Sequence, residues 1–310
     1  INHENYHPFF GDGMIHGIRV EDGKALWYKN KFVTSPFGFG PNTHVLKHGE
    51  KIYALVEGGV SPVIMDSEMN FLEEEPFPAA DDKRFTAHPK IDSDTGEMHA
   101  VSYDFGEYVN GLGQVHYVTI DSHGKLIKDQ IIETPSRPMV HDCAITKNYV
   151  LIFDLPVTFN LGRRDDDNNP IGGDYPVVWN DKHTSRVGLQ SKKTDEIIWI
   201  EVNPGFLFHI VNSYENENGQ VVLDFCRYER LFDFENPLPM GQKPFLTRWI
   251  LDPKAKTCSE EMLDDRPMEF SRVHPDYDGK QHRFGYLLND GRLNNYFKHD
   301  FEKSKTIAHD

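Results

Sequence analysis

Short runs of β-branched and aromatic residues alternate with turns of Gly, Asn, Asp or Pro along almost the whole chain. Such runs are typical of β-strands, and a tight turn between two of them is typical of a hairpin. Long amphipathic segments with the 3.6-residue period of a helix are missing from the pattern. The hairpins that we expect cover residues 43–58, 114–133, 142–155, 208–228, 245–263 and 293–310.

The recurrence of these hairpins predicts an all-β fold. We expect one β-propeller domain over residues 1–310, in which four-stranded blades surround a central channel. A pair of β-sandwiches is the alternative, because the hairpins share little sequence with one another. The chain has 310 residues, of which 38% are hydrophobic, enough for a large core. The polar segment GRRDDDNNPIGGD, residues 162–174, is expected to be a solvent-exposed loop.

Charge and cysteine content narrow the range of partners and compartments. The formal net charge of −16 argues against a nucleic-acid partner, which would require a basic face. The three cysteines are widely spaced and form no CxxC motif, which fits a reducing, cytoplasmic setting without a disulfide framework. No apolar run approaches the ~20 residues of a membrane-spanning helix.

The chain contains 16 histidines, and most of them have ordinary explanations. The turn positions and polar surroundings of five histidines predict surface sites: His48, His123, His183, His274 and His299.

Three other histidines, His88, His141 and His209, lie at the edges of apolar strands, about one blade apart. Inner strands of successive blades could aim all three at one axis and form a metal site. Three separate core histidines, each hydrogen-bonded to backbone, are the alternative.

At these residues the chain resembles the carotenoid cleavage oxygenase family, which includes apocarotenoid oxygenases, the retinal-pigment isomerase and lignostilbene dioxygenases. The resemblance is carried, in family order, by FFGDGMIHGI (9–18), NTHVLKHGEKIYALVEGG (42–59), FTAHPKIDSDTGEMH (85–99), MVHDCAITKNYVLIFDLPVTF (139–159), FHIVNSYENENGQVVLDFCRY (208–228) and the C-terminal HRFGYLL and FKHDFEKSKTIAHD.

The resemblance implies a seven-bladed propeller with one ferrous ion, Fe(2+), held on its axis by four histidines. His88, His141 and His209 resemble the first three of these ligands. Glu57 in LVEGG and Glu269 in MEF resemble glutamates that orient the histidines by accepting their second ring N–H. Neutral imidazoles suit Fe(II) and leave coordination positions open for dioxygen.

Two departures from the family pattern affect these expectations. The family's fourth histidine lies in a His-Gly motif of a C-terminal blade, and neither His299 nor His309 matches it. The family's N-terminal segment is also missing, and the chain opens at Ile1. We therefore expect an incomplete propeller that is a fragment of a longer enzyme. A truncated member with an incomplete iron site is the alternative.

The function implied by the resemblance is that of a non-haem Fe(II)-dependent dioxygenase. Such an enzyme uses O2 to cleave a conjugated C=C bond of a carotenoid or apocarotenoid into two carbonyl products. Phe159, Phe206 and Phe208 lie near the ligand motifs and are expected either to line an apolar tunnel for the polyene or to pack in the core.

Substrate choice within the family depends here on Val56. Stilbene-cleaving relatives carry a lysine at this position, so Val56 favours an apolar apocarotenoid over a lignostilbene-type substrate. A retinoid isomerase is a third option, disfavoured by the acidity of the chain. The charged segment GRRDDDNN, residues 162–169, which follows LPVTF, predicts at most weak contact with a membrane surface.

Two functions from other classes remain as alternatives. A non-catalytic propeller that serves as a binding scaffold would keep the hairpins but would not need axial histidines with glutamates behind them. A propeller that acts on glycosides would depend on a pair of carboxylates, and no motif singles out such a pair.

Overall fold

The structure, a computed structural model, describes residues 13–33, 40–58, 61–72, 85–103, 113–159, 177–233, 242–289 and 295–309. Within these ranges the regular structure is β-strand, apart from one 3-10 helix, η2 (Pro275–Tyr277). The expected loop at residues 162–174 lies outside the described residues. In the described part of the chain, no helix is both long and apolar enough to cross a membrane.

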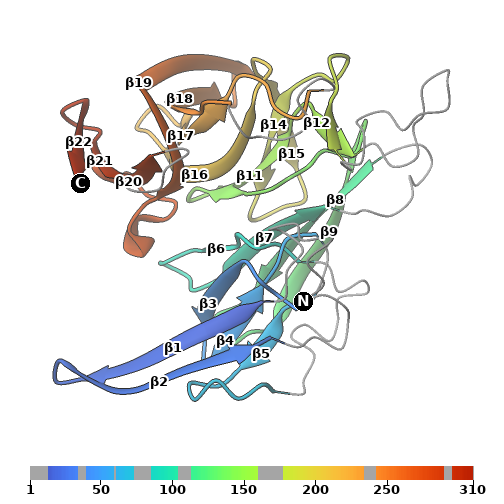
Figure 1. Cartoon of the computed structure of the whole chain (residues 1–310). Helices are drawn as coiled ribbons and strands as arrows, with labels where there is room; N and C mark the ends of the chain where they lie inside the picture. The colour runs from blue at the N-terminus through green and yellow to red at the C-terminus, as the bar shows by residue number, and fades with distance from the viewer. Residues whose placement is uncertain are drawn as a thin grey trace, which may run out of the picture.

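The strands form antiparallel sheets in which neighbours along the chain are mostly neighbours in space (Figure 1). The N-terminal sheets contain β1 (Met14–Glu21) and β2 (Lys24–Phe32); β3 (His44–His48), β4 (Lys51–Leu55) and β5 (Val63–Met65); and β6 (Lys90–Ile91), β7 (Met98–Tyr103), β8 (Gly113–Ile120) and β9 (Leu126–Thr134).

The following sheets contain β10 (Ala144–Ile145), β11 (Tyr149–Asp154), β14 (Arg186–Ser191) and β15 (Ile197–Glu201), with β12 (Val157–Phe159) and β13 (Val177–Trp179) as a separate pair. The last sheet contains β16 (Phe206–Glu215), β17 (Val221–Tyr228), β18 (Phe245–Asp252), β19 (Thr257–Arg272), β20 (Phe284–Asn289), β21 (Tyr296–Asp300) and β22 (Lys305–His309).

All six expected hairpins are present, and local turn chemistry explains them. In the β8–β9 hairpin, Asp121 Oδ1 accepts the backbone N–H groups of His123 and Lys125, each at 2.9 Å. Gly124 in the same turn has φ +84°, a conformation that costs glycine least. A carboxylate that bonds backbone two and four residues ahead fixes the turn before any tertiary contact forms.

The long strand β19 joins two four-stranded units. Its first part pairs with β18 as far as Pro267, with a register shift after Met262, and its last part pairs with β20 from Met268 onward. Strands β16–β19 and β19–β22 therefore make two successive units of one seven-stranded sheet, bent between them as Figure 1 shows. Antiparallel four-stranded units that follow one another along the chain are what radial blades require.

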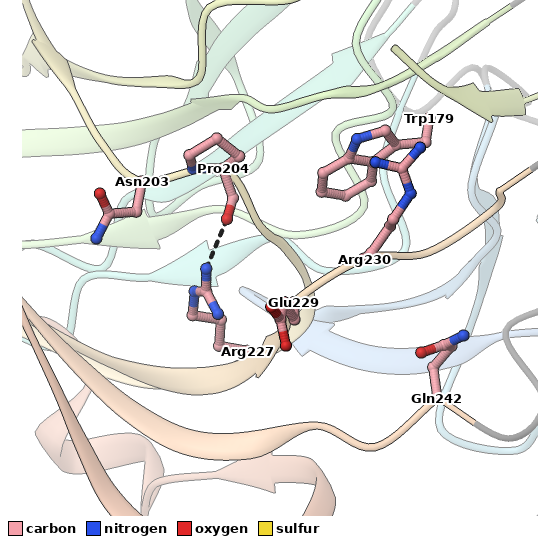
Figure 2. A pocket seen from close by; sticks show the side chains of 7 residues that line it. All are labelled: Trp179, Asn203, Pro204, Arg227, Glu229, Arg230 and Gln242. Carbon is pink, nitrogen blue, oxygen red and sulfur yellow. Dashed lines mark hydrogen bonds between the residues drawn. The ribbon is translucent and has the colours of Figure 1, made fainter. Parts of the chain in front are cut away.

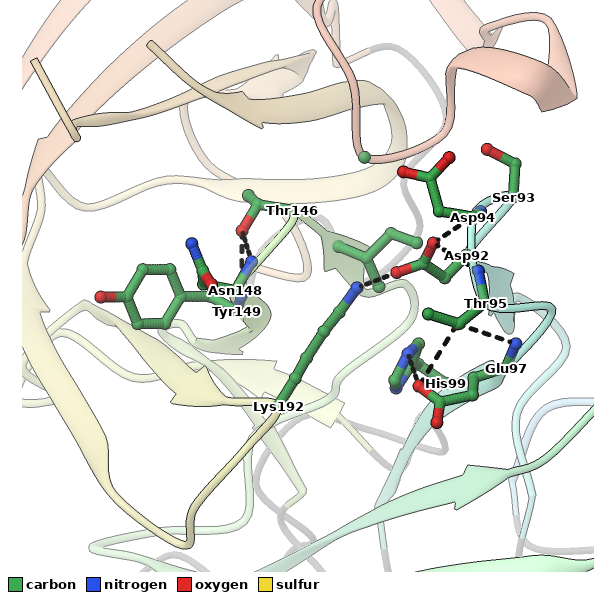
Figure 3. Close-up of polar contacts among 12 residues, drawn as sticks. Asp92, Ser93, Asp94, Thr95, Glu97, His99, Thr146, Asn148, Tyr149 and Lys192 are labelled. Atoms are coloured by element: carbon green, nitrogen blue, oxygen red, sulfur yellow. Dashed lines mark hydrogen bonds and ion pairs between the residues drawn. The ribbon is translucent and has the colours of Figure 1, made fainter. Parts of the chain in front are cut away.

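Ion pairs and hydrogen bonds connect successive sheets. Lys192 Nζ, just after β14, lies 2.7 Å from Asp92 Oδ2, just after β6 (Figure 3). Both side chains are largely buried, so the pair holds the β6–β9 sheet against the β10–β15 sheet with little screening by solvent. The carboxylate of Glu215 in β16 similarly accepts hydrogen bonds from Thr146 Oγ1 at 2.7 Å and Asn148 Nδ2 at 2.8 Å.

The surface positions expected for five histidines are correct for two of them. His123 and His274 are exposed, but His48 and His299 are only 4% and 1% exposed, and the side chain of His183 is only 3% exposed. His48 Nε2 is 2.9 Å from the carbonyl oxygen of Gly96, in the turn between β6 and β7 of another sheet. His183 and His299 likewise contact residues outside their immediate sequence neighbourhood, Ser136 and Thr306, so contacts within the fold bury all three rings.

Candidate metal centre

Three successive sheets each bring one histidine to the same place. His88 lies two residues before β6 and His141 three residues before β10, while His209 lies within β16. Each of these strands is the first of its sheet. The repeated topology therefore turns a wide spacing in sequence into proximity in space.

The three imidazoles face one another. The ring centroids of His88 and His141 are 4.6 Å apart, those of His88 and His209 5.2 Å, and those of His141 and His209 5.1 Å. One nitrogen from each ring lies within 4.8 Å of the others. The three rings do not form the separate, backbone-bonded core histidines that were the alternative interpretation.

Two glutamates hold two of the rings from behind. His141 Nδ1 lies 2.7 Å from Glu57 Oε2, and His209 Nδ1 lies 2.5 Å from Glu269 Oε2. In each pair the ring Nδ1–H donates to a carboxylate, so the Nε2 lone pair is left for another partner. Glu57 and Glu269 thus each contact one histidine of the cluster.

The remaining ring nitrogens are short of partners. Within the described residues, both nitrogens of His88 and Nε2 of His141 are buried and make no hydrogen bond. Buried polar atoms are nearly always satisfied, and each exception needs an explanation. Lone pairs that converge on one point and accept nothing from the protein are the donor set that a divalent transition metal requires.

The electrostatics keep His88 neutral. Burial, followed by the neighbouring rings of His141 and His209, lowers the pKa of His88 well below its usual value. For His141, burial opposes the charge, but the carboxylate of Glu57 outweighs it and raises the pKa. Glu57 therefore favours retention of the proton on Nδ1 of His141. The donor set fits Fe(II), because imidazole is a suitable ligand for this ion. Neutral imidazoles leave the metal charge to be balanced by the carboxylates behind them.

Tyr103 is a site residue that sequence reasoning missed. Its hydroxyl donates to Glu57 Oε1 at 2.7 Å, while the other oxygen of Glu57 takes the His141 contact. Burial, and next the charge of Glu57, raises the pKa of Tyr103 well above its usual value, so the hydroxyl keeps its proton. A tyrosine at the end of a strand carries no sequence signal for this role.

Phe270 was missed as well. Its ring stacks on His209, with centroids 4.9 Å apart and planes at 29°, and its backbone N–H donates to Glu269 Oε2. Phe270 has φ +53°, a strained conformation for a bulky residue, at the register shift of β19. The shift turns the strand so that Glu269 and Phe270 both reach His209.

The three phenylalanines expected at the tunnel lie around the histidines. The ring of Phe208 meets His141 edge to face at 5.0 Å, and Phe206 packs on Phe208 at 5.1 Å. Phe159 lies 5.0 Å from the ring of Tyr103. Phe159 and Phe206 are buried and Phe208 is half-buried. These contacts establish an apolar surround for the cluster, whichever of the two expected roles the rings serve.

A surface cavity of about 530 Å³ lies elsewhere and is not lined by any of the three histidines (Figure 2). Both of its arginines already have partners. Arg227 donates to the carbonyl oxygen of Pro204 at 2.5 Å, and Arg230 pairs with Asp181 at 2.6 Å. The cavity is open to solvent, whereas the histidine cluster carries buried ring nitrogens without a hydrogen-bond partner, so we place the chemistry at the cluster.

Comparisons with known proteins agree with this choice. The family model described as "Retinal pigment epithelial membrane protein" matches residues 40–309. The chain is 33% identical to the carotenoid cleavage oxygenase of Mycobacterium tuberculosis, over 93% of this chain and 68% of that protein.

Two solved structures show the fold. The lignostilbene dioxygenase of Pseudomonas brassicacearum superposes with a TM-score of 0.83 at 23% identity, over 97% of this chain and 72% of that chain. A cobalt-substituted oxygenase of Synechocystis superposes with a TM-score of 0.81 at 22% identity, over 98% and 73%. These matches confirm the predicted propeller, of which this chain spans part, and exclude the β-sandwich alternative.

Proposed function

The chain belongs to the retinal pigment epithelial membrane protein family, that of the carotenoid cleavage oxygenases, and from this premise we propose that it is a non-haem Fe(II)-dependent dioxygenase. Its substrate would be a carotenoid or apocarotenoid, cleaved with O2 at one conjugated C=C bond. Each new carbonyl group receives one oxygen atom. We propose that residues 1–310 belong to one propeller domain.

The observation that carries the proposal is the set of three facing imidazoles with unpartnered buried nitrogens and two carboxylates behind them. His88, His141 and His209 would hold the iron, which supplies, when bound, the O2 chemistry that side chains lack. Neither a plain binding scaffold nor a glycoside hydrolase needs such a donor set. A hydrolase would need two carboxylates facing a substrate, whereas Glu57 and Glu269 are both bonded to histidines.

Other side chains orient the imidazole rings and exclude water from the site. Glu57 and Glu269 keep the Nδ1 protons of His141 and His209, so both rings present Nε2. Phe206 and Phe208 offer an apolar face beside His141, which suits a polyene and excludes water. Packing of the polyene against these rings, and not charge, would then orient one double bond next to the iron.

The alkyl side chain of Val56 favours an apocarotenoid as substrate over a hydroxystilbene. Val56 directly precedes Glu57, at the position where stilbene-cleaving relatives have a lysine, and an alkyl side chain offers no cation to a phenolate. We expect the iron-loaded full-length protein to consume apocarotenals or apocarotenols and to yield two carbonyl products. Hydroxystilbenes should be turned over poorly.

The test follows the loss of polyene or stilbene absorbance under O2, with iron content measured on the same samples. Val56→Lys serves as the matched variant and should gain activity on hydroxystilbenes relative to apocarotenals. Faster turnover of hydroxystilbene by the unaltered protein would overturn the substrate assignment. Failure to bind iron at all would overturn the enzyme assignment.

A further inference from the structure

One buried carboxylate, that of Asp142, bonds to three different parts of the chain. Its side chain is only 2% exposed, and its Oδ1 lies 2.8 Å from Lys90 Nζ. Oδ1 also accepts the backbone N–H of Cys143 at 2.8 Å, and Oδ2 accepts the backbone N–H of Ile210 at 3.3 Å. Lys90 is also buried, with 8% of its side chain exposed.

These partners all lie within two residues of a candidate ligand in the sequence. Asp142 follows His141 directly, Lys90 is the second residue after His88, and Ile210 follows His209 directly. The carboxylate therefore ties together the three segments that carry the histidines, although they belong to three different sheets.

We propose that Asp142 is a positioning residue that holds His88, His141 and His209 at the spacing required for metal binding. It acts through the side chain of Lys90 and the backbone N–H groups of Cys143 and Ile210, because these groups and not the rings take up its two oxygens. The inference rests on the proposed function, since it presumes that the three imidazoles bind a metal.

The physical reason is the small tolerance of a metal site. Productive sites hold their ligands to within about 0.5 Å, and supporting contacts usually set this precision. Asp142 combines an ion pair with a hydrogen bond to backbone, and both are out of contact with water, where such interactions are least screened. The ion pair alone is weak grounds for stability, because a buried pair of charges can often be replaced by apolar residues at no cost. We expect the ion pair between Asp142 and Lys90 to matter because it fixes the relative positions of the segments that carry the histidines.

The test measures Co(II) affinity by competition with a chelator, together with the visible absorption of the bound ion. Asp142→Asn retains the shape but loses the charge that pairs with Lys90, and we expect a loss of affinity of about tenfold or more. Asp142→Glu retains the charge but displaces the carboxylate by one methylene, and we expect an altered absorption spectrum even if affinity falls less. The second variant keeps the test decisive if Asp142→Asn fails to fold.

Asp154→Asn is the matched control. Asp154 in β11 is fully buried and pairs with Arg186 at 2.7 Å, but no candidate ligand lies on β11 or on its neighbour β14. This variant should lose thermal stability as the Asp142 variants do while its Co(II) affinity and spectrum stay those of the unaltered chain. A purely structural role for Asp142 would make the two sites behave alike.

Three results overturn the inference, and they are distinguishable. If the unaltered chain binds Co(II) and both Asp142 variants keep its affinity within twofold and its spectrum, Asp142 does not position the ligands, and the proposed function stands. If the unaltered chain binds no Co(II), the metal site itself is wrong and the role of Asp142 falls with it. Equal loss of affinity in Asp154→Asn would also refute a specific role.

Discussion

Substitution of Glu57 tests how much the carboxylate behind His141 contributes to metal binding. Glu57 uses its two oxygens separately, one for the hydroxyl of Tyr103 and the other for Nδ1 of His141, both at 2.7 Å. In Glu57→Gln a single carbonyl oxygen remains as acceptor, and the charge is lost. The side chain is otherwise nearly the same size, so the packing around it should persist.

The magnitude follows from these two hydrogen bonds. A hydrogen bond to a charged group contributes about 1.5–3 kcal/mol, and one between neutral groups about 0.5–1.5 kcal/mol. Loss of the charge at His141 therefore costs about 1–1.5 kcal/mol, or roughly tenfold in metal affinity. Glu57→Leu removes both acceptors, so the Nδ1–H of His141 loses its carboxylate partner at a cost of about 1–3 kcal/mol. Its affinity should fall well below that of Glu57→Gln.

Competition of each variant with a chelator for Co(II) or Fe(II) measures these losses, and thermal unfolding reports stability. Glu215→Gln is the control, because Glu215 also bonds neighbouring side chains, those of Thr146 and Asn148, but has no contact with a histidine of the cluster. Metal affinity in this control should equal that of the unaltered chain. An affinity of Glu57→Gln within twofold of the unaltered chain would refute the reasoning, as would an equal loss in Glu215→Gln.

Three further predictions concern the ligands, the pH dependence and the packing. His209→Ala should remove most of the bound iron, and full occupancy in this variant, measured by metal analysis, would contradict its assignment as a ligand. Burial lowers the pKa of His99 to about 3, so its contribution to stability is complete above pH 6.5 and is lost as the pH falls toward 3. This should remove roughly 3 kcal/mol from the free energy of unfolding between pH 7 and 4, measured by urea titration, and His99→Gln should flatten the dependence. Gly113→Ala should destabilise by about 1–3 kcal/mol, because a Cβ there would lie 1.9 Å from the carbonyl oxygen of Ser136; an unchanged melting temperature would show that the strand can move aside.

Local sequence signals were enough to predict the hairpins. The β8–β9 turn is an example, since Asp121 and Gly124 determine its backbone by contacts within five residues. Strand propensity and turn chemistry act over such short distances, so they survive in the sequence without knowledge of the fold. The continuation of β19 from one unit into the next was not predictable in this way, because it depends on pairing with β18 and β20 on either side.

The candidate ligands were found because each histidine lies at the edge of an apolar run inside a recognisable motif. Spacing along the chain left separate core histidines as an open alternative, and only the structure brings the three rings within about 5 Å. Glu57 and Glu269 were found by resemblance alone, since an isolated glutamate carries no sign of its partner.

Tyr103, Asp142 and Phe270 were assigned no role from the sequence, although each contacts the site or the segments that form it. The burial of His48 and His299 was missed for the same reason. A side chain's partner across sheets depends on how the sheets pack, and packing is a property of the whole chain. The sequence alone determined which strands form and which histidines lie near them, whereas the tertiary structure decided which polar groups meet in the dry interior, where an unpaired group is too costly to leave.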